Sequence, residues 1–317
     1  MLHLDVLVRR PTSFVSLTGL TVAEFEALYE AFATAYERHR AAATTTRRDQ
    51  EVRQRAPGGG PRYAHDLQHR LLMALVWLKI YPTYEVLGLL FALHKRNAQL
   101  NVRDVLEVLE TLDDFPFDRP PSDRERLSSV EQVMEAFPQV RLIIDSKEQR
   151  VYRPGGSWER QKPFYSGKKK AHTLKVQIGV LPCGLVSSLS APVPGSVNDV
   201  RLLRETGLLD RLEHGESALT DKGYEGAEKG YPEGRLLRQR KNRKRRPLTE
   251  ADKAQNRLLA RYRVVVEHTI AQLNRFTVLR QVYRGSKARH GRVVRVVATL
   301  VNRRTRVRPL KTYAAAA

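Results

Sequence analysis

The chain has 317 residues, of which 56 are Lys or Arg and 34 are Asp or Glu, so its formal net charge is +22. Its hydrophobic content of 41% is typical of a folded protein and excludes a disordered one. So large an excess of positive charge makes a compact chain repel itself, and it therefore indicates a polyanionic partner. Nucleic acid, acidic lipid and the ribosome all fit, and the charge alone does not separate them.

Cysteine content and hydropathy indicate a reducing, aqueous compartment. Cys183 is the only cysteine, so no disulfide can form within the chain. The N-terminal residues lack the pattern of an export signal. The most apolar segments, residues 71–77 and 86–93, are too short and too interrupted to span a bilayer. We therefore expect a soluble cytoplasmic protein with no membrane partner.

The first 125 residues are typical of one helix after another. Thr21 and Glu24 have the spacing of a capping box, and apolar residues follow at helical intervals. Residues 40–62 are polar and end in Gly-Gly-Gly-Pro, which predicts a linker or flexible loop.

Residues 83–112 predict a helix-turn-helix. One helical pattern ends before Pro82, a second runs from about Thr83 to Phe91, and a third from about Lys95 to Leu112. In such a motif the polar residues that begin the second helix face base edges in the major groove, and here they are Lys95, Arg96, Asn97 and Gln99. An ordinary αα-hairpin fits the same pattern, and the net charge favours the DNA-binding interpretation.

Strand patterns replace helical ones from about residue 140. Residues 140–145 (VRLIID) form a short apolar run that ends on Asp145. Three runs follow it and predict an antiparallel meander; they span residues 149–154, 171–182 and 184–192. A helical pattern over residues 198–212 precedes a further short strand, SALTD, that ends on Asp221. Helix is predicted again from about residue 249 to 275 and from 290 to 304, which gives an α+β or α/β fold class.

Three acidic residues form a candidate metal site. Asp145 and Asp221 end predicted strands, where chemistry commonly collects, and Glu267 follows Arg263 by one helical turn. Carboxylates from three distant segments, with few His or Cys nearby, are typical of a site for Mg²⁺ or Mn²⁺ rather than zinc. Two such ions about 3.5–4 Å apart would support an in-line displacement at phosphorus. Taken singly, each aspartate also fits a turn former, and Glu267 also fits a simple surface ion pair with Arg263.

Five segments, in order, resemble the DDE transposases of bacterial insertion sequences, in particular the insertion-sequence-five group and its Harbinger-like relatives. They are LIIDSKEQRVYRP, QKPFYSGKKKAHTLKVQ, GSVNDVRLL, LTDKGYEG and RYRVVVEHTIAQLNRF. The helical segment LLMALVWLKIYPTYEVLGLLF resembles the N-terminal domain of that family. Each segment alone is a weak signal, but five in order are specific, and together they cover most of the chain.

The resemblance implies a domain plan and an activity. It implies a helical DNA-binding domain over residues 1–125, a ribonuclease-H-like catalytic domain with a mixed sheet over 140–305, and a basic, alanine-rich tail over 306–317. Asp145, Asp221 and Glu267 would be the catalytic acids and would hold two Mg²⁺ or Mn²⁺ ions. The protein would bind the terminal inverted repeats of its element, cut there and join the 3′ ends to target DNA. It would do so as a homodimer on synapsed double-stranded DNA, at the bacterial nucleoid.

The chain departs from the family pattern around the glutamate, which reads Tyr-x₂-Arg-x₃-Glu-x₆-Lys. Arg263 and Glu267 are present, but Ala260 and Asn274 stand at the Tyr and Lys positions. Tyr262 and Arg275 are the nearest residues that could replace them in holding DNA. The departures leave open whether this copy is active. The three acids are intact, however, which argues against an inactive remnant of a transposase.

Asp199 is the main alternative to Asp221 as a metal ligand. Because it lies at the start of a predicted helix, it also fits a negative charge that interacts with the helix dipole. Further predicted DNA contacts are basic or aromatic residues near the presumed cleft; they are Lys168, Lys169, Lys170, His172, Tyr224, Arg240, Lys241, Arg243, Lys244, Arg245, Arg246, Arg263 and Arg275. A solvated lysine run fits residues 168–170 nearly as well, and a core role fits Tyr224. The basic cluster 238–246 predicts backbone binding that weakens steeply with salt.

Two other functions fit parts of the sequence. A DNA-binding regulator without catalysis would use only the helix-turn-helix, and the three acids argue against it. A ribonuclease-H-like nuclease would hydrolyse DNA without strand transfer, and only the family resemblance favours a transposase over it.

Overall fold

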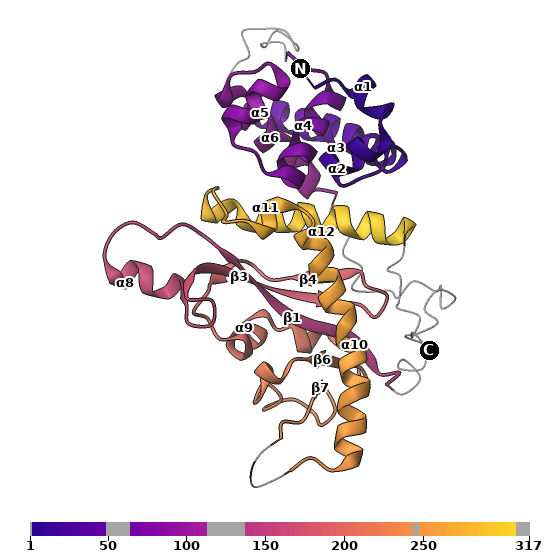
Figure 1. Cartoon of the computed structure of the whole chain (residues 1–317), viewed down its shortest axis with the longest axis vertical. Helices are drawn as coiled ribbons and strands as arrows, with labels where there is room; N and C mark the ends of the chain where they lie inside the picture. The colour runs from indigo at the N-terminus through magenta and orange to yellow at the C-terminus, as the bar shows by residue number, and fades with distance from the viewer. Residues whose placement is uncertain (1, 49–63, 113–136, 243, 245–246, 309–317) are drawn as a thin grey trace. The chain divides into compact units, whose positions relative to one another are not determined.

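The computed structural model describes residues 2–48, 64–112, 137–242, 244 and 247–308 (Figure 1). These residues form two compact units. Unit 1 consists of the described residues of Met1–Asp113 with Arg275–Arg280 and Arg292–Thr299. Unit 2 consists of those of Asp114–Asn274, Gln281–Gly291 and Leu300–Ala317. Unit 1 therefore combines the N-terminal part of the sequence with two segments near the C-terminus, which the pattern of elements along the chain did not predict.

Unit 1 is built from helices. In chain order they are α1 (Leu4–Val8), α2 (Pro11–Thr18), α3 (Val22–Arg48), α4 (Leu67–Ile80), α5 (Tyr84–Phe91), α6 (Lys95–Glu110) and α11 (Thr277–Arg280). The predicted capping box is present, since the Thr21 backbone N–H donates to Glu24 Oε2 at 2.7 Å and that of Glu24 donates to Thr21 Oγ1 at 3.3 Å. Because α3 continues to Arg48, residues 40–48 of the predicted linker are helical; residues 49–62 lie outside the described part.

The helices α5 and α6 match the predicted pair over residues 83–112. The Thr83 and His94 side chains cap them by accepting backbone N–H groups of Val86 and Arg96. The turn between the helices is tight enough that a Cβ on Gly88 would collide with the Leu93 carbonyl oxygen. The turn therefore needs glycine at residue 88. Two helices and a tight turn are thus present, while DNA binding by them stays a prediction.

Unit 2 contains a mixed sheet of seven strands. They are β1 (Val140–Arg150), β2 (Tyr165–Ser166), β3 (Ala171–Val180), β4 (Val186–Leu189), β5 (Val193–Pro194), β6 (Ser217–Thr220) and β7 (Leu236–Arg238). β1 is central, because it pairs antiparallel with β3 on one side and parallel with β6 on the other. β7 extends the parallel part beside β6, and β4 and β5 pair antiparallel with β3. The mixed α/β class is confirmed, and an antiparallel meander is present, but β1 takes the place of its first predicted strand.

Two strand predictions were wrong in detail. β1 does not end on Asp145 but continues to Arg150, because residues 146–150 pair with residues 173–177 of β3. The separate strand predicted over residues 149–154 is absent, since its first two residues are the end of β1.

Helices pack against the sheet of unit 2. They are α9 (Asp199–Thr206), α10 (Glu250–Asn274) and part of α12 (His290–Val307), while α8 (Trp158–Gln161) lies in the segment that connects β1 to β3. Leu142 and Ile144 of β1 share a buried core with Leu203 of α9. Side chains alternate along a strand, so Asp145 and its odd-numbered neighbours point to the other face, toward α10, which crosses the strands in Figure 1. No helix among the described residues is both long and apolar enough to cross a membrane.

Candidate active site

Asp145 lies within β1 and is half-buried. Burial raises the pKa of its carboxyl group, while the backbone N–H of Ser146, which donates to Oδ1 at 2.7 Å, and the charge of Arg263 lower it. The negative charges of Asp221 and Asp199 raise the pKa further. Residues far apart in the sequence therefore lie close enough to act on the charge of Asp145.

Arg263 of α10 brings the other two predicted acids together. Its Nη1 lies 3.8 Å from Oδ1 of Asp221, which follows the end of β6, and its Nη2 lies 3.5 Å from Oε1 of Glu267 one turn later on α10. The Arg263 side chain is only 15% exposed, whereas those of Asp221 and Glu267 are 40% and 55% exposed. The arginine is thus the buried centre of an acidic cluster that opens to solvent.

The donor chemistry of this cluster fits a divalent cation. Carboxylate oxygens are the ligands that Mg²⁺ and Mn²⁺ prefer, and a cation would relieve the repulsion of Asp145 by Asp221. Within the described residues, no three or more His, Cys, Asp or Glu side chains are arranged as a ready metal-binding group. Arg263 is the cation that Asp221 and Glu267 share in this structure.

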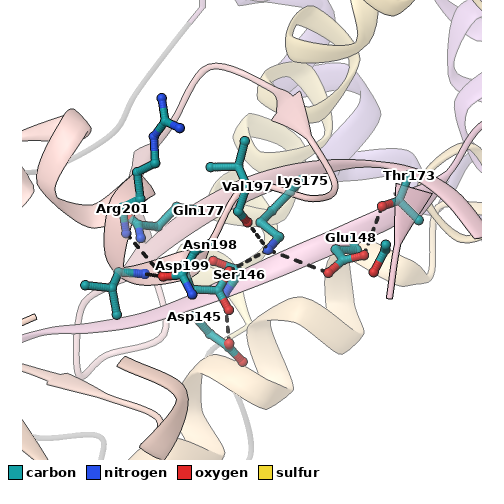
Figure 2. A network of polar contacts seen from close by, with 12 residues as sticks. Asp145, Ser146, Glu148, Thr173, Lys175, Gln177, Val197, Asn198, Asp199 and Arg201 are labelled. Carbon is teal, nitrogen blue, oxygen red and sulfur yellow. Dashed lines mark hydrogen bonds and ion pairs between the residues drawn. The ribbon is translucent and has the colours of Figure 1, made fainter. Parts of the chain in front are cut away.

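Asp199 belongs to a different charge network. Lys175 of β3 is 7% exposed, and its Nζ lies 2.9 Å from Oδ1 of Asp199 and 3.7 Å from Oε1 of Glu148. It also donates to the carbonyl oxygen of Val197 at 2.6 Å. Glu148 in turn accepts the Thr173 hydroxyl at 2.9 Å. Figure 2 shows the Lys175 side chain pointing toward the acceptors that surround it.

Comparison with known proteins places these residues in a family. Residues 144–302, half of the chain, match the model of the DDE superfamily endonucleases, and the match includes Asp145, Asp221 and Glu267. The chain is a DDE superfamily endonuclease. A probable transposase for insertion sequence element IS702 from Microchaete diplosiphon is 27% identical over 253 residues, which are 80% of this chain and 85% of that protein. No solved structure gives a significant match. The predicted family is confirmed.

The structure explains why the segment GSVND, residues 195–199 at the start of α9, has these residues. A Cβ on Gly195 would overlap the Thr173 hydroxyl, so only glycine allows this approach to β3. The Asn198 side chain caps α9 by accepting the N–H of Val200 at 2.8 Å. Asp199 is neutralised by Lys175. Each of the three residues has a role in holding α9 against β3, which favours Asp221 over Asp199 as the carboxylate that joins Asp145 and Glu267 in the site.

Two tyrosines that the sequence placed near DNA lie in the core. Tyr224 is 1% exposed, and its hydroxyl is 2.8 Å from Ser146 Oγ and accepts Gln177 Nε2 at 3.4 Å. Burial raises its pKa above the usual range. Neither face of the Tyr224 ring is open to a DNA base. The predicted stacking on DNA is therefore wrong for this conformation, and Tyr224 has the alternative role in the core. Tyr262 is also 1% exposed and packs against Phe137, so it does not replace the family tyrosine at a DNA surface.

The predicted basic contacts that the structure describes are mostly exposed. Exposed side chains are those of Lys95, Arg96, Asn97 and Gln99 at the start of α6, and of Lys168, Lys169, Lys170, Arg240, Lys241, Lys244 and Arg275. His172 is half-buried and its ring packs edge-on against Tyr165. Arg243, Arg245 and Arg246 lie outside the described residues. DNA contact by these residues stays a prediction.

Some of these cations already pair with acids. Lys241 Nζ lies 2.8 Å from Glu225 Oε2, and Arg240 forms a close ion pair with Asp252. Lys95 Nζ is 3.5 Å from Glu85 Oε2. Such exposed pairs are weak and screened by salt, so DNA phosphates can replace the carboxylates.

Sequence reasoning missed Lys175 and Glu148. The available signal was the position of Lys175 in the run LKVQIGV, where it is the one charged residue of a mainly apolar strand segment. A buried lysine requires an acidic partner. The partners lie on two other segments, and the pattern of β3 alone does not name them.

Proposed function

We propose that this DDE endonuclease is a transposase that binds the terminal inverted repeats of its insertion sequence, cuts DNA there and joins the 3′ ends to target DNA. The observation that carries the proposal is the gathering of Asp145, Asp221 and Glu267 around Arg263 inside the family-matched region. The relative from Microchaete diplosiphon, a probable transposase, supports strand transfer over simple hydrolysis. Helices packed on a mixed sheet support a ribonuclease-H-like catalytic domain.

Asp145, Asp221 and Glu267 would hold two Mg²⁺ or Mn²⁺ ions. When bound, such ions activate a water or 3′-hydroxyl nucleophile and stabilise the leaving oxygen of an in-line displacement. The protein's own contribution is to preassemble the acids. The Ser146 N–H orients Asp145, and Arg263 limits the repulsion between Asp221 and Glu267 before a metal ion binds.

DNA would be held by surfaces outside the acids. The exposed polar residues at the N-terminus of α6 suit the major groove of the inverted repeat. The basic segment around residues 240–246 suits phosphates, with an affinity that falls steeply as salt rises. Two element ends must be synapsed for transposition, so we include a homodimer on DNA in the proposal.

The test uses duplex DNA carrying the inverted repeats that flank the reading frame, together with supercoiled target DNA and Mg²⁺. We expect cleavage at the repeat ends and covalently joined products, and loss of both in Asp145→Asn and Glu267→Gln. A Glu205→Gln variant is the matched control, because Glu205 is an exposed acid whose ion pair within the described part of the chain is with Arg201 in α9. Cleavage without joined products would instead indicate a nuclease, and metal-independent cleavage would refute the proposal.

A further inference from the structure

The segment Tyr152–Lys170 carries an unusual concentration of exposed rings, and we call it the aromatic lobe. It connects β1 to β3, contains α8 and β2, and extends from the sheet on the left in Figure 1. Tyr152, Trp158 and Tyr165 are 65%, 52% and 36% exposed. They are the three exposed aromatic residues of the described part of the chain; the other exposed large hydrophobic residues there are Val, Leu or Ile.

The same lobe is strongly basic. Six of its residues are Lys or Arg and one, Glu159, is acidic. All six basic side chains are exposed; they are Arg153, Arg160, Lys162, Lys168, Lys169 and Lys170. Rings interleaved with exposed cations are typical of surfaces that bind single-stranded nucleic acid, because each base offers a ring face and each nucleotide a phosphate.

The lobe is held in shape by buried contacts. Gln161 is 6% exposed, accepts Arg153 Nε at 2.7 Å and donates to the Gly156 carbonyl oxygen at 2.7 Å. The rings of Trp158 and Tyr165 then lie 6.3 Å apart between centroids, in a tilted arrangement. Rings that are already positioned lose little conformational entropy when a base stacks on them.

We propose that the aromatic lobe binds unpaired nucleotides of DNA, with bases stacked on Trp158 and Tyr165 and phosphates on the lysines of residues 168–170. In an intact duplex the base faces already stack on one another, so the exposed rings would have no role there. The inference rests on the proposed function for its choice of DNA, since cutting at element ends produces strand ends whose bases can unpair. Binding itself requires neither metal nor cleavage.

The test uses tryptophan fluorescence, because the chain has two tryptophans in contrasting places. Trp158 is 52% exposed in the lobe, whereas Trp77 of α4 is 4% exposed. In EDTA, we expect single-stranded oligothymidine to quench the emission of wild type and Trp77→Phe, and to leave that of Trp158→Phe unchanged. Trp158→Ala should weaken single-strand binding by about 5- to 100-fold, and blunt-duplex binding by less than about twofold.

Controls separate stacking from charge and from catalysis. Lys169→Gln should weaken single-strand and duplex binding by similar factors, because it removes a phosphate contact alone. Asp221→Asn should keep the quenching, so a protein that cuts no DNA still tests the lobe. Unchanged single-strand affinity in Trp158→Ala, an equal loss for duplex, or tighter binding of oligouridine RNA than of DNA would each overturn the proposal. Circular dichroism of Trp158→Ala should match wild type, since the side chain is exposed.

Discussion

Two clusters of acids around a cation lie in the sheet region of this endonuclease, and they are built differently. Around Lys175 the acceptors are close, with Val197 O at 2.6 Å and Asp199 Oδ1 at 2.9 Å, and the lysine is 7% exposed. Around Arg263 the acids stand at 3.5 and 3.8 Å, beyond hydrogen-bond length, and both are at least 40% exposed. We call the Lys175 cluster closed, because its acceptors lie close to a buried cation, and the Arg263 cluster open, because its acids are exposed and lie farther from the cation.

The difference indicates which acids can exchange partners. Lys175 and Glu148 are 7% and 9% exposed, and a buried charge that loses its partner is left uncompensated, so the fold holds this cluster together although Asp199 is 30% exposed. Exposed carboxylates at long range from an arginine lose little when water or another cation replaces it. This difference favours Asp221 and Glu267 over Asp199 as the acids that a metal ion would reach.

We expect the largest effect, on the rate of DNA cleavage, when one acid of each cluster is replaced in turn by its amide. We expect Asp221→Asn to slow DNA cleavage by about 100- to 1000-fold, a loss of the size seen when one group that stabilises transition-state charge is removed. Asp199→Asn, the matched control, should slow it by less than about tenfold, because Asp199 acts through the packing of α9 and through a charge effect on Asp145 that is weaker than that of Asp221. Single-turnover cleavage rates measure both. A larger loss in Asp199→Asn than in Asp221→Asn would assign the role of metal ligand to Asp199 instead of Asp221.

The second test removes each cation with the same substitution. Lys175→Met leaves Glu148 and Asp199 without their buried partner, and we expect the free energy of unfolding to fall by about 3–5 kcal/mol. Arg263→Met leaves two acids that water can reach, and we expect a loss of at most about 1 kcal/mol. Urea unfolding of the two variants beside wild type gives both values. Equal losses would remove the distinction between a closed and an open cluster.

The sequence predicted the open cluster better than the closed one, for a physical reason. Asp145 and Asp221 follow apolar runs that specify strands locally, and the i,i+4 spacing of Arg263 and Glu267 specifies one helical face. Lys175 takes its partners from two segments more than 20 residues away in opposite directions. Its network is therefore a property of sheet pairing, which the local pattern does not encode.

Strand ends were mispredicted for the same reason. Residues 146–150, SKEQR, have the composition of a loop, yet they continue β1 because β3 supplies their pairing partners. The three residues of β7, at the start of a basic segment, were also missed, and they form a strand because β6 pairs with them. Helix boundaries such as Thr21, Thr83 and Lys95 were predicted well, since caps and periodicity are local.

A pH experiment examines the face of β1 that carries the open cluster. His290 packs on this face, where its Nε2 lies 2.9 Å from Gln149 Oε1. Burial lowers its pKa to about 4 from 6.5, and the positive charge of Lys147 adds to the shift. The unfolded chain therefore binds more protons between pH 4 and 6.5, so stability rises with pH through this window.

We expect the free energy of unfolding to fall by about 2 kcal/mol from pH 7 to pH 5 through His290. His290→Gln, which keeps a donor for Gln149, should remove most of this slope. Urea titrations at the two pH values measure it, and Lys175→Met is the control because it should keep the slope at lower overall stability. A slope that persists in His290→Gln would assign it to other groups.

The smallest effect concerns how the closed cluster is tied to α9. The Asn198 side chain accepts the N–H groups of Val200 and Arg201, so Asn198→Ala should cost about 1 kcal/mol and Asn198→Ser should restore most of it. Residues 197–199 join this cap to the acceptors of Lys175, so the cap and the ion pairs depend on the same backbone. The double variant Asn198→Ala, Lys175→Met should then lose less stability than the two single losses together. Additive losses would mean that the cap and the buried cation hold α9 independently.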